Sequence, residues 1–435
     1  MLSGWGRMPV VPGVERRSED LEALTREIAL ARGLGRAYGD AALPAPGDLF
    51  VVGTTLANRL LAFDEATGLL TAESGVSLDE LCSVFLPRGF FTPVSPGTRF
   101  VTLGGMVACD VHGKNHHRDG TFGQHVVRLT LRVADGRVMS CSSTVHRDLF
   151  FATIGGMGLT GAILDVTFRM ARVPSSWIVE ARERVSDIDR FVERLKQTSA
   201  EWPMTVGWID CLTTGKHLGR GVLIRGRWAE PHEARSTPPP ALRTLTAPVE
   251  FPNFLLRKPM VQAFNAVNYW RHAGLGRSTL AHPYRFFYPL DAILNWRRVY
   301  GRRGFVQYQC VLPTTAGSEA AKRFLEVLTR MGGASYLCVI KDCGPQGIGL
   351  LSFPMPGISI AMDIPCGAAT QKLVGALNAQ VIAEGGRIYL AKDALTRADE
   401  FRAMEPRLDR FLEIRRAWDP DGLIRSAQSV RLFGW

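Results

Sequence analysis

The sequence lacks the features that define several large classes of protein. None of its apolar runs approaches the ~20 residues that a membrane-spanning helix needs. The first segment, MLSGWGRMPVVPGVERRSED, has no continuous apolar stretch and no small-residue cleavage site, so we expect no secretory signal peptide and a cytoplasmic protein. The eight cysteines show no C-x-x-C spacing, which argues against a disulfide framework and against a zinc ribbon.

Motifs for nucleic-acid binding are also missing, although the charge is positive. The chain has 52 Lys and Arg against 41 Asp and Glu, a net charge of +11, and such a field favours anionic partners. No helix-turn-helix, zinc-finger or aromatic RNA-binding signature accompanies it, so we expect no nucleic-acid partner and favour phosphates or an acidic membrane surface. At 435 residues the chain is long enough for two domains.

A doubly wound dinucleotide domain is disfavoured for a similar reason. The spacing G-x-G-x-x-G occurs at residues 156–161, but the alternating, β-branched segment AILDVTF follows it, and that segment predicts a strand. The nucleotide fold requires a helix there, because the helix N-terminus holds the pyrophosphate. A second glycine-rich stretch, RGLGRAYGD at 32–40, is followed by Pro44 and Pro46, which exclude a helix directly after it.

The elements that are present predict an α+β protein in which the pattern of helices and strands changes along the chain. Up to about residue 170, short apolar runs alternate with glycines, and LRVADGRVMS predicts a β-hairpin turning at Asp135-Gly136. SLDELCSVFLPRG predicts a helix capped by Ser77. From about residue 176, helix patterns (VSDIDRFVERLKQ, SEAAKRFLEVLTRMGG) alternate with strand patterns (GVLIRGRWAE, FVQYQCVLP, YLCVIKD, GISIAMDIP). We expect a second α+β domain here, with its own sheet.

Two glycine-rich loops suggest a ligand held by backbone. In RGLGRAYGD, closely spaced glycines allow successive N–H groups to form an anion-binding concavity, with Arg32 and Arg36 adding charge. The alternative is a tight turn between strands. SPGTRFVTLGG at 95–105 is either loop or a surface on which a flat ligand lies against the backbone. With GGMGLTG at 155–161, the three segments together favour an extended dinucleotide such as FAD.

These segments also carry a resemblance to a known family. RGLGRAYGD, VTLGGMVACDVHGKNHHRDGTFGQHV and LFFATIGGMGLTGAILDVTFRM resemble the flavin-binding half of the vanillyl-alcohol-oxidase (PCMH-type FAD) superfamily. More narrowly, CDVHGKNHH, WID at 208–210, FVQYQCVLP, LLSFPMPG and YLAKD resemble the decaprenylphosphoryl-β-D-ribose 2-oxidase family. The resemblance implies a PCMH-type FAD domain formed by residues 1–175, an inserted α+β substrate domain at 176–385, and a C-terminal segment, 386–435, that returns to the FAD domain.

The resemblance further implies non-covalent FAD, since Arg36 stands where covalent members carry a flavin-linking histidine. The residues that it places around the cofactor are Arg32, Gly33, Leu34, Gly35, Arg36, Ala37, Tyr38, Gly39, Asp40, Gly97, Thr102, Leu103, Gly104, Gly105, Cys109, Asp110, His112, Ile163 and Tyr389.

The stretch CDVHGKNHH admits three interpretations. Its three histidines suggest metal binding, but adjacent histidines point in different directions and no carboxylate or cysteine partner has ligand spacing, so we expect no metal. Cys109 with His112 suggests a nucleophile, although a buried small thiol is the commoner case. The third interpretation, a wall of the flavin pocket, is the one we favour. The resemblance then makes His112 and Lys114 active-site residues, with Lys114 facing an anionic substrate.

The resemblance makes Lys392, in YLAKD, the predicted catalytic residue. Removing hydride from a carbinol carbon requires the hydroxyl proton to leave, and a desolvated lysine has a pKa low enough to accept it. The alternative is a surface lysine at a strand end. For substrate binding we expect Gln307 and Gln309, which alternate on one strand face, together with Trp208, Lys341 and Ser359. The alternative for each of these residues is a structural role in the core or at the surface.

One departure from the family pattern concerns the strand SIAMDIP. The family's oxidases have a cysteine where this sequence has Ala361, and usually an asparagine where it has Ser359. A thiol is therefore not required at this position, and the pocket differs in shape and polarity.

The resemblance, together with these residues, implies an FAD-dependent oxidoreductase that converts a secondary hydroxyl of a sugar into a keto-sugar. The expected sugar is a phosphate-bearing or lipid-phosphate-linked pentose, or a nucleoside-like glycoside. A short-chain NAD(P)H reductase partner would make the net reaction an epimerisation. The basic, aromatic segment 251–277 predicts either peripheral membrane contact or a helix covering the pocket. The rival functions are an oxygen-using aldonolactone or alcohol oxidase and a non-catalytic phosphate- or nucleic-acid-binding protein.

Overall fold

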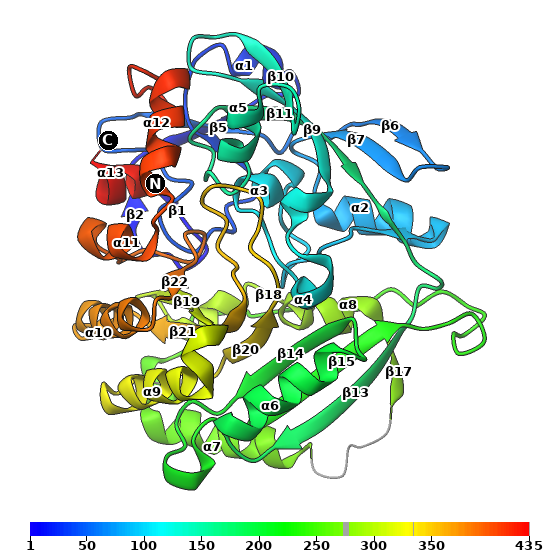
Figure 1. Cartoon of the computed structure of the whole chain (residues 1–435), viewed down its shortest axis with the longest axis vertical. Coiled ribbons are helices and arrows are strands. Elements are labelled where there is room, and N and C mark those ends of the chain that lie inside the picture. The colour runs from blue at the N-terminus through cyan, green and yellow to red at the C-terminus, as the bar shows by residue number, and fades with distance from the viewer. Residues whose placement is uncertain (273–277, 334, 435) are drawn as a thin grey trace.

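The computed structural model describes residues 1–272, 278–333 and 335–434. Two parts lie one above the other (Figure 1): a part built from the N-terminal third and the C-terminal helices, and a part built on one large sheet from the middle of the chain. No helix in the described ranges is long and apolar enough to cross a membrane.

The N-terminal part contains two larger sheets and two short strand pairs, β1-β2 and β8-β12. Strands β3, β5 and β4 form a parallel three-stranded sheet, and an antiparallel five-stranded sheet has the order β10-β9-β11-β7-β6. The predicted hairpin is confirmed, with β9 and β10 paired around Gly136, whose φ is +85°. The strand bounds are β1 Leu2–Ser3, β2 Val10–Val11, β3 Val14–Arg17, β4 Ala31–Arg32, β5 Phe50–Gly53, β6 Leu60–Asp64, β7 Leu69–Glu73, β8 Phe90–Phe91, β9 Val126–Arg132, β10 Val138–Ser142, β11 Ala162–Arg169 and β12 Ala171–Arg172.

Short helices pack against these sheets. The predicted helix after Ser77 is confirmed as α2, where the Ser77 hydroxyl accepts from the Glu80 N–H and the Glu80 carboxylate accepts from the Ser77 N–H. Its Leu78, Leu81 and Phe85 side chains are buried. The bounds are α1 Leu21–Leu24, α2 Leu78–Phe85, α3 Leu103–Ala108, α4 His116–Asp119 and α5 Arg147–Thr153, with 3-10 turns at Leu86–Arg88 and Phe122–His125.

The end of the glycine-rich segment 95–105 is helical rather than loop. Thr102 caps α3 by accepting from the Gly105 N–H at 3.3 Å, so the helix begins at Leu103 despite its two glycines. The glycines serve close packing: a Cβ added to Gly104 would lie 2.9 Å from the Cβ of Ser74. The cap and this contact outweigh the low helix propensity of glycine.

The middle of the chain forms an antiparallel eight-stranded sheet with the order β17-β13-β15-β14-β20-β21-β19-β22. All four strands predicted from residue 221 onward are confirmed within it. The bounds are β13 Ile178–Val185, β14 Met204–Ile209, β15 Gly221–Trp228, β17 Thr279–Ala281, β19 Phe305–Pro313, β20 Cys338–Cys343, β21 Gly357–Pro365 and β22 Arg387–Ile388, with a separate pair formed by β16 Leu245–Thr246 and β18 Ile293–Leu294.

Helices cover both faces of this sheet. Helices α6, α9 and α10 lie on the face away from the N-terminal part, with their apolar sides buried. Helices α6 and α9 are the two that the sequence predicted. The helix bounds are α6 Ile188–Ser199, α7 Lys258–Trp270, α8 Pro283–Phe287, α9 Gly317–Arg330 and α10 Thr370–Ala383, with 3-10 turns at Gly215–His217, Asn253–Leu256, Pro289–Ala292, Trp296–Tyr300 and Thr314–Ala316. The other face meets the N-terminal part through α8 and the residues around His112.

After β22 the chain crosses back to the N-terminal part, where α11 Ala398–Met404, α12 Leu408–Trp418 and α13 Ala427–Phe433 pack. Both termini lie on this side (Figure 1). Arg431 on α13 donates to the carboxylates of Asp40 and Asp393, each at 2.8 Å, and both carboxylates are buried. This ion-pair cluster therefore anchors the C-terminal segment to the glycine-rich loop 32–42.

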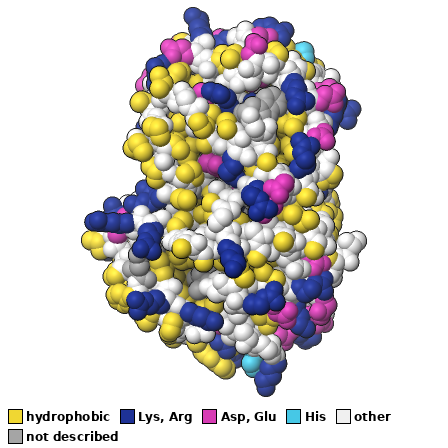
Figure 2. Space-filling model, turned by 90° about the vertical axis from the view of Figure 1, so that its left-hand side faces the viewer, with side chains coloured by type: hydrophobic (Ala, Val, Ile, Leu, Met, Phe, Trp, Pro, Cys, Tyr) yellow, Lys and Arg dark blue, Asp and Glu magenta, His cyan; other side chains and the backbone are white. Residues whose placement is uncertain are grey.

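Positive charge is dispersed on the side of the molecule that carries α10 and α11. Figure 2 shows Lys and Arg side chains spread among hydrophobic, uncharged and acidic ones over this face. The charge there forms no single stripe of the kind that follows a nucleic-acid backbone.

Candidate active site

The two predicted cofactor loops lie directly against each other. A Cβ added to Gly33 would lie 2.1 Å from the Thr102 hydroxyl, so only glycine permits this approach. Loop 32–42 is held by main-chain hydrogen bonds, because Trp5 and Gly6 donate to Ala37 and Tyr38, and the Tyr38 N–H donates to Ala391 at 2.9 Å. Residues from the start, the first third and the end of the chain thus form one backbone surface.

The two arginines of the first loop are used differently. Arg32 donates to the carbonyls of Ala42 and Ser3, both at 2.8 Å, so it supports the loop from inside. The Arg36 guanidinium lies over the rings of Trp5, at 3.9 Å, and Phe100, at 5.2 Å. Its buried Nε has no hydrogen-bond partner within the described ranges. Arg36 is therefore placed to bind an anion.

This surface fits FAD. A Cβ added to Gly97 would meet nothing within 4 Å, so the space beside it is open. The buried Ser74 hydroxyl, like the Arg36 Nε, lacks a partner among the residues that the structure describes. A backbone wall built from glycines, with donors left unsatisfied by the chain, suits a ligand with a flat ring and a diphosphate. Residues 32–39, 97 and 102–105 would hold it.

The stretch from Cys109 to Lys114 continues this wall toward the large sheet. The Cys109 carbonyl accepts from the Tyr389 hydroxyl at 2.9 Å, which joins α3 to the C-terminal segment. Asp110, at φ +40°, has a fully buried carboxylate that accepts from the Gly123 N–H and the Ser352 hydroxyl. Burial raises the pKa of Asp110 to about 6 despite these bonds. Asp110 thus ties loops together, and its main chain is the part that borders the site.

His112 presents a hydrogen-bond donor to the site. Burial, with Lys341 and His116 nearby, lowers the pKa of His112 well below its ordinary value, so its ring is neutral. Its Nε2 accepts from the Gln309 side-chain amide at 2.9 Å, which leaves the proton on Nδ1. In the described part of the chain that buried Nδ1 has no partner. The N–H is therefore available to a bound ligand.

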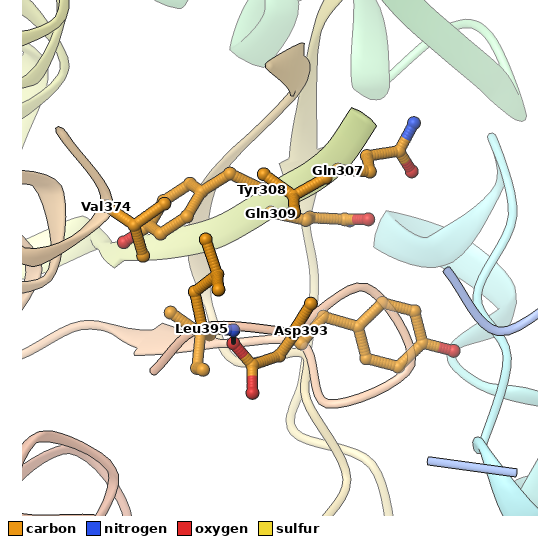
Figure 3. Close-up of a pocket in the computed structure, with 10 residues that line it drawn as sticks. Gln307, Tyr308, Gln309, Val374, Asp393 and Leu395 are labelled. Carbon is orange, nitrogen blue, oxygen red and sulfur yellow. Dashed lines mark hydrogen bonds between the residues drawn. The ribbon is translucent and has the colours of Figure 1, made fainter. Parts of the chain in front are cut away.

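The register of the large sheet brings the predicted substrate residues onto one face. Directly opposite pairs point to the same side, and the pairs here are Gln307 with Asp363, Gln309 with Ala361, and Lys341 with Ser359. In Figure 3, Gln307 and Gln309 point to one side of β19 and Tyr308 to the other, toward Val374. This second side is filled, since only about 10 Å³ of space remains there.

Three lysines surround this face. Burial, together with the charge of Lys341, lowers the pKa of both Lys114 and Lys392 to about 7, and burial lowers that of Lys341 as well. The Lys114 ammonium donates to the Phe287 carbonyl at 2.9 Å, and Lys392 lies over the Tyr38 ring, with Nζ 3.8 Å from its centroid. At neutral pH two of these side chains are each close to half protonated, which suits proton transfer and anion binding.

Asp363 and Tyr300 belong to this site and were not predicted. The Tyr300 hydroxyl donates to Asp363 at 2.8 Å, and the Gln307 amide donates to the same carboxylate at 2.5 Å. A signal for Asp363 was present: it follows Ser359 and Ala361 at the period of two that defines one strand face. Tyr300 gave no such signal, because it lies on a 3-10 turn whose position the sequence does not indicate.

The remaining predicted residues contact other parts of the chain. Ile163 pairs with Leu131 in the five-stranded sheet and is buried. Leu34 is 40% exposed. The Asp40 carboxylate is bound by Arg431, so any cofactor contact there is through its main chain. Trp208 lies on the substrate face of β14, opposite Val339, and its indole N–H donates to the Tyr336 carbonyl at 3.0 Å.

For the metal interpretation, the His112 and His116 rings lie 6.2 Å apart and nearly perpendicular. Within the described ranges no three His, Cys, Asp or Glu side chains are grouped to hold a metal ion.

A second, larger cavity lies at the β17 edge of the sheet. It has a volume of about 730 Å³, and four arginines line it: Arg182, Arg235, Arg271 and Arg285. Buried Glu180 is the acidic residue of its wall, and the same carboxylate acts on the pKa of Lys114. The cavity therefore adjoins the lysine face of the candidate active site.

Comparison with known proteins agrees with this geometry. Residues 22–142 match the family model of an FAD-binding domain. The chain is 38% identical over 450 residues to decaprenylphosphoryl-beta-D-ribose oxidase of Mycolicibacterium smegmatis, covering 99% of this chain and 97% of the relative. It is 32% identical to an uncharacterized Streptomyces coelicolor protein from the mprA 5' region, over 82% of this chain and all of the relative. The similarity to L-gulonolactone oxidase of mouse, 31% identical, covers 31% of this chain.

The fold and the cofactor surface define an FAD-dependent oxidoreductase with an α+β, PCMH-type FAD-binding domain. More narrowly, the chain belongs to the decaprenylphosphoryl-β-D-ribose oxidase family of these flavoproteins. The expected resemblance and the expected FAD cofactor are thereby confirmed.

Proposed function

We propose that this protein oxidises a secondary hydroxyl of a pentose that carries a phosphate, or a lipid-linked phosphate, to the keto-sugar. One observation carries the proposal: Lys392, a buried lysine whose pKa is about 7, lies against Tyr38 of the cofactor loop and near Lys341 of the sheet face that carries Gln307 and Gln309. The M. smegmatis relative is named for oxidising such a phosphoribosyl lipid, and the similarity covers nearly the whole chain.

The chain's own residues supply the proton chemistry. Residues 32–39, 97 and 102–105 would hold FAD, which would supply the acceptor for the hydride of the carbinol carbon. Lys392, as the neutral amine, takes the proton from the hydroxyl oxygen, so the C–H and O–H bonds are replaced by one carbonyl and an ammonium. On the same face the His112 Nδ1–H presents a hydrogen-bond donor, and Gln309, whose amide N–H groups donate to His112 and Ser359, leaves its carbonyl oxygen as an acceptor. These two groups orient the sugar. The lysine amine is regenerated when the ammonium loses its proton to solvent.

Positive charge on this face supports an anionic substrate. The charge of Lys341 lowers the pKa of Lys114, so the two side chains lie near each other, and burial of both favours a bound anion that neutralises them. The arginine-lined cavity beyond Glu180 extends the positive field away from the flavin. A phosphate attached to the sugar would therefore lie between the lysines and this cavity.

Two positions make the sugar pocket of this chain distinct. Ala361 and Ser359 are smaller than the cysteine and asparagine that the family pattern has there, and both are on the substrate face of β21. Ser359 accepts from Gln309 at 3.2 Å, so the serine positions that amide. The space gained at Ala361 admits a bulkier group beside Gln309 than a cysteine would.

The proposal is tested by anaerobic mixing of the FAD-loaded protein with candidate sugars while the flavin absorbance is followed. We expect bleaching with a short-chain polyprenylphosphoryl ribose, and none with aldonolactones or free pentoses at the same concentration. Bleaching by an aldonolactone instead would favour the alternative of a lactone or alcohol oxidase. A protein that binds no flavin under any loading condition would favour the non-catalytic alternative.

The keto-sugar product requires a further reaction. A ketone formed beside a phosphorylated anomeric carbon is reduced from either face by an NAD(P)H-dependent enzyme. We propose a short-chain NAD(P)H reductase as a functional partner, so that oxidation here and reduction there together invert one carbon.

Helix α7 supports the proposed peripheral contact with an anionic membrane. Its polar residues Asn265 and Asn268 are buried, whereas Phe264, Val267 and Trp270 are 47%, 66% and 58% exposed. This is the reverse of the usual pattern for a helix of a globular protein. Arg257, Lys258 and Arg271 flank the apolar side chains. The remainder of the predicted segment, 273–277, which includes Arg277, lies outside the described residues.

The membrane proposal predicts that replacing Phe264, Val267 and Trp270 together by serine lowers binding to vesicles containing phosphatidylglycerol at least tenfold, about 1.4 kcal/mol. Cosedimentation at low and high salt measures it. The matched control replaces the exposed Leu61 and Val127 of the FAD-binding part by serine, which should leave vesicle binding unchanged. Equal vesicle binding by both variants would contradict this role of α7.

A further inference from the structure

A buried acidic group next to Lys392 has no role in the chemistry described so far. Asp363 on β21 is fully buried, and two neutral side chains are committed to it: the Tyr300 hydroxyl and the Gln307 amide each donate to one of its carboxylate oxygens. Its neighbours are therefore donors that stabilise the charged form. Such an arrangement is costly in an interior unless a positive charge compensates it.

Lys392 is the cation that faces this carboxylate. The negative charge of Asp363 raises the pKa of Lys392, and the charge of Lys392 lowers that of Asp363, so each acts on the other through space. The Lys392 Nζ also lies 3.8 Å from the centroid of the Tyr38 ring. The Tyr300 ring, whose hydroxyl donates to Asp363, stacks on Phe305 with centroids 4.2 Å apart, and all three side chains are buried.

We propose that Asp363 is a positioning residue for the oxidation: its carboxylate, fixed by Tyr300 and Gln307, is the stationary negative charge that stabilises the ammonium of Lys392 as the hydroxyl proton arrives. The inference rests on the proposed function. In the step concerned, the proton moves from the sugar hydroxyl to Lys392 Nζ, and Asp363 neither gains nor loses a proton. Gln307 is then assigned to Asp363 rather than to a sugar hydroxyl.

The other groups around Asp363 and Lys392 determine in which direction the pKa of Lys392 moves when the carboxylate charge is lost. Lys341 on β20 lowers the pKa of Lys392, and Cys109 at the end of α3 acts in the opposite direction. Burial raises the pKa of Asp363 to about 6, below that of Lys392. At pH 7 the carboxylate is therefore ionised while the lysine is near half protonation. Loss of the carboxylate charge removes the largest of the effects that oppose burial and Lys341, so the pKa of Lys392 falls.

Asp363→Asn is the direct test, because an asparagine can accept from Gln307 and donate to the Tyr300 oxygen without the charge. The chain has only eight lysines, so [ε-¹³C]lysine labelling of the FAD-loaded protein allows Lys392 to be titrated by NMR, assigned with Lys392→Met. We expect its apparent pKa to fall by about one unit, a tenfold change in the amine-to-ammonium ratio. The low-pH limb of substrate-dependent flavin bleaching should move to lower pH by the same amount, with a lower plateau.

Matched variants separate this role from a structural one. Asp342→Asn removes a carboxylate on the opposite face of the same sheet, where Asp342 accepts from Ser199, and should leave the titration of Lys392 unchanged. Tyr300→Phe keeps the charge but removes one donor, and should lower the pKa of Lys392 by a smaller amount. If Asp363→Asn does not fold, Tyr300→Phe alone still tests the inference.

An unchanged titration of Lys392 in Asp363→Asn, or in Tyr300→Phe if it is the variant that folds, would overturn the inference. Because this measurement needs no substrate, it is independent of the proposed function. Failure of the wild-type protein to be bleached by any sugar phosphate would contradict the function alone. Bleaching abolished by Asp363→Asn but retained by Lys392→Met would make Asp363 the base and would also overturn the inference.

Discussion

Lys392→Met is expected to lower the rate of substrate-dependent flavin bleaching by about 10²–10⁴-fold while FAD remains bound. Methionine preserves the length and most of the packing of the side chain but cannot accept a proton. The ring of Tyr38 tolerates it, since a thioether also packs well on an aromatic face. Anaerobic stopped-flow absorbance measures the rate, and the flavin spectrum of the purified variant measures the retained cofactor.

The pH dependence gives the same prediction an independent check. The pKa of Lys392 is about 7, so the amine that accepts the proton predominates above pH 7 and is lost as pH falls through that value. In the wild-type protein the bleaching rate should therefore fall on the acidic side. Lys114, whose pKa is also about 7, is charged on that side, so substrate affinity should weaken as pH rises. The rate and the affinity should change in opposite directions.

Lys372→Met is the control for the lysine substitution. Lys372 is exposed on α10, on the far side of the sheet from the flavin wall, and should contribute nothing to either measurement. A Lys392→Met rate within threefold of the wild-type rate would refute the assignment of Lys392 as the proton acceptor.

Gly97→Leu is expected to weaken FAD binding at least tenfold, about 1.4 kcal/mol, without destabilising the flavin-free protein. No atom of the chain lies within 4 Å of a Cβ at this position, and no left-handed φ is involved, so the leucine strains nothing in the fold. The collision that it causes is with a ligand on the glycine surface. Flavin content after purification and titration of the apoprotein with FAD measure the loss.

Gly367→Leu provides the matched comparison. Gly367 precedes α10, is equally open, and has an ordinary φ, but it lies away from the proposed flavin surface. We expect normal flavin content and a melting temperature close to that of Gly97→Leu without FAD. Full FAD affinity in Gly97→Leu would contradict the placement of the cofactor beside residue 97.

The sequence predicted elements well where a local pattern decides the structure. The cap at Ser77, the hairpin at Asp135-Gly136 and the amphipathic helices α6 and α9 each depend on residues that are neighbours in the chain. For the 95–105 segment the sequence left loop and a ligand-binding backbone surface open, and it did not predict that the segment ends in a helix. The helix α3 forms there because Ser74, about 30 residues away, requires close packing, and Thr102 supplies the cap.

The candidate site divides in the same way. Period-two alternation predicted that Gln307 and Gln309 share a face, and the motif context singled out Lys392 and the histidine stretch. The sequence could not show that the Gln307 amide and the Tyr300 hydroxyl both donate to Asp363. Nor could it show that Asp40 accepts from Arg431. These contacts join residues between 56 and 391 positions apart, and only folding brings them together.

What the amino-acid sequence determined by itself is the chemistry available: glycine loops for a flavin, a set of lysines for protons and anions, and strands whose alternation gives one polar face. What only the tertiary structure decided is the state of those groups. The pKa of Lys392 is near 7 because the sheet, the loop and the C-terminal segment bury it between Tyr38, Lys341 and Asp363. Desolvation and charge act over a few ångströms in space, and the linear order of residues does not contain those distances.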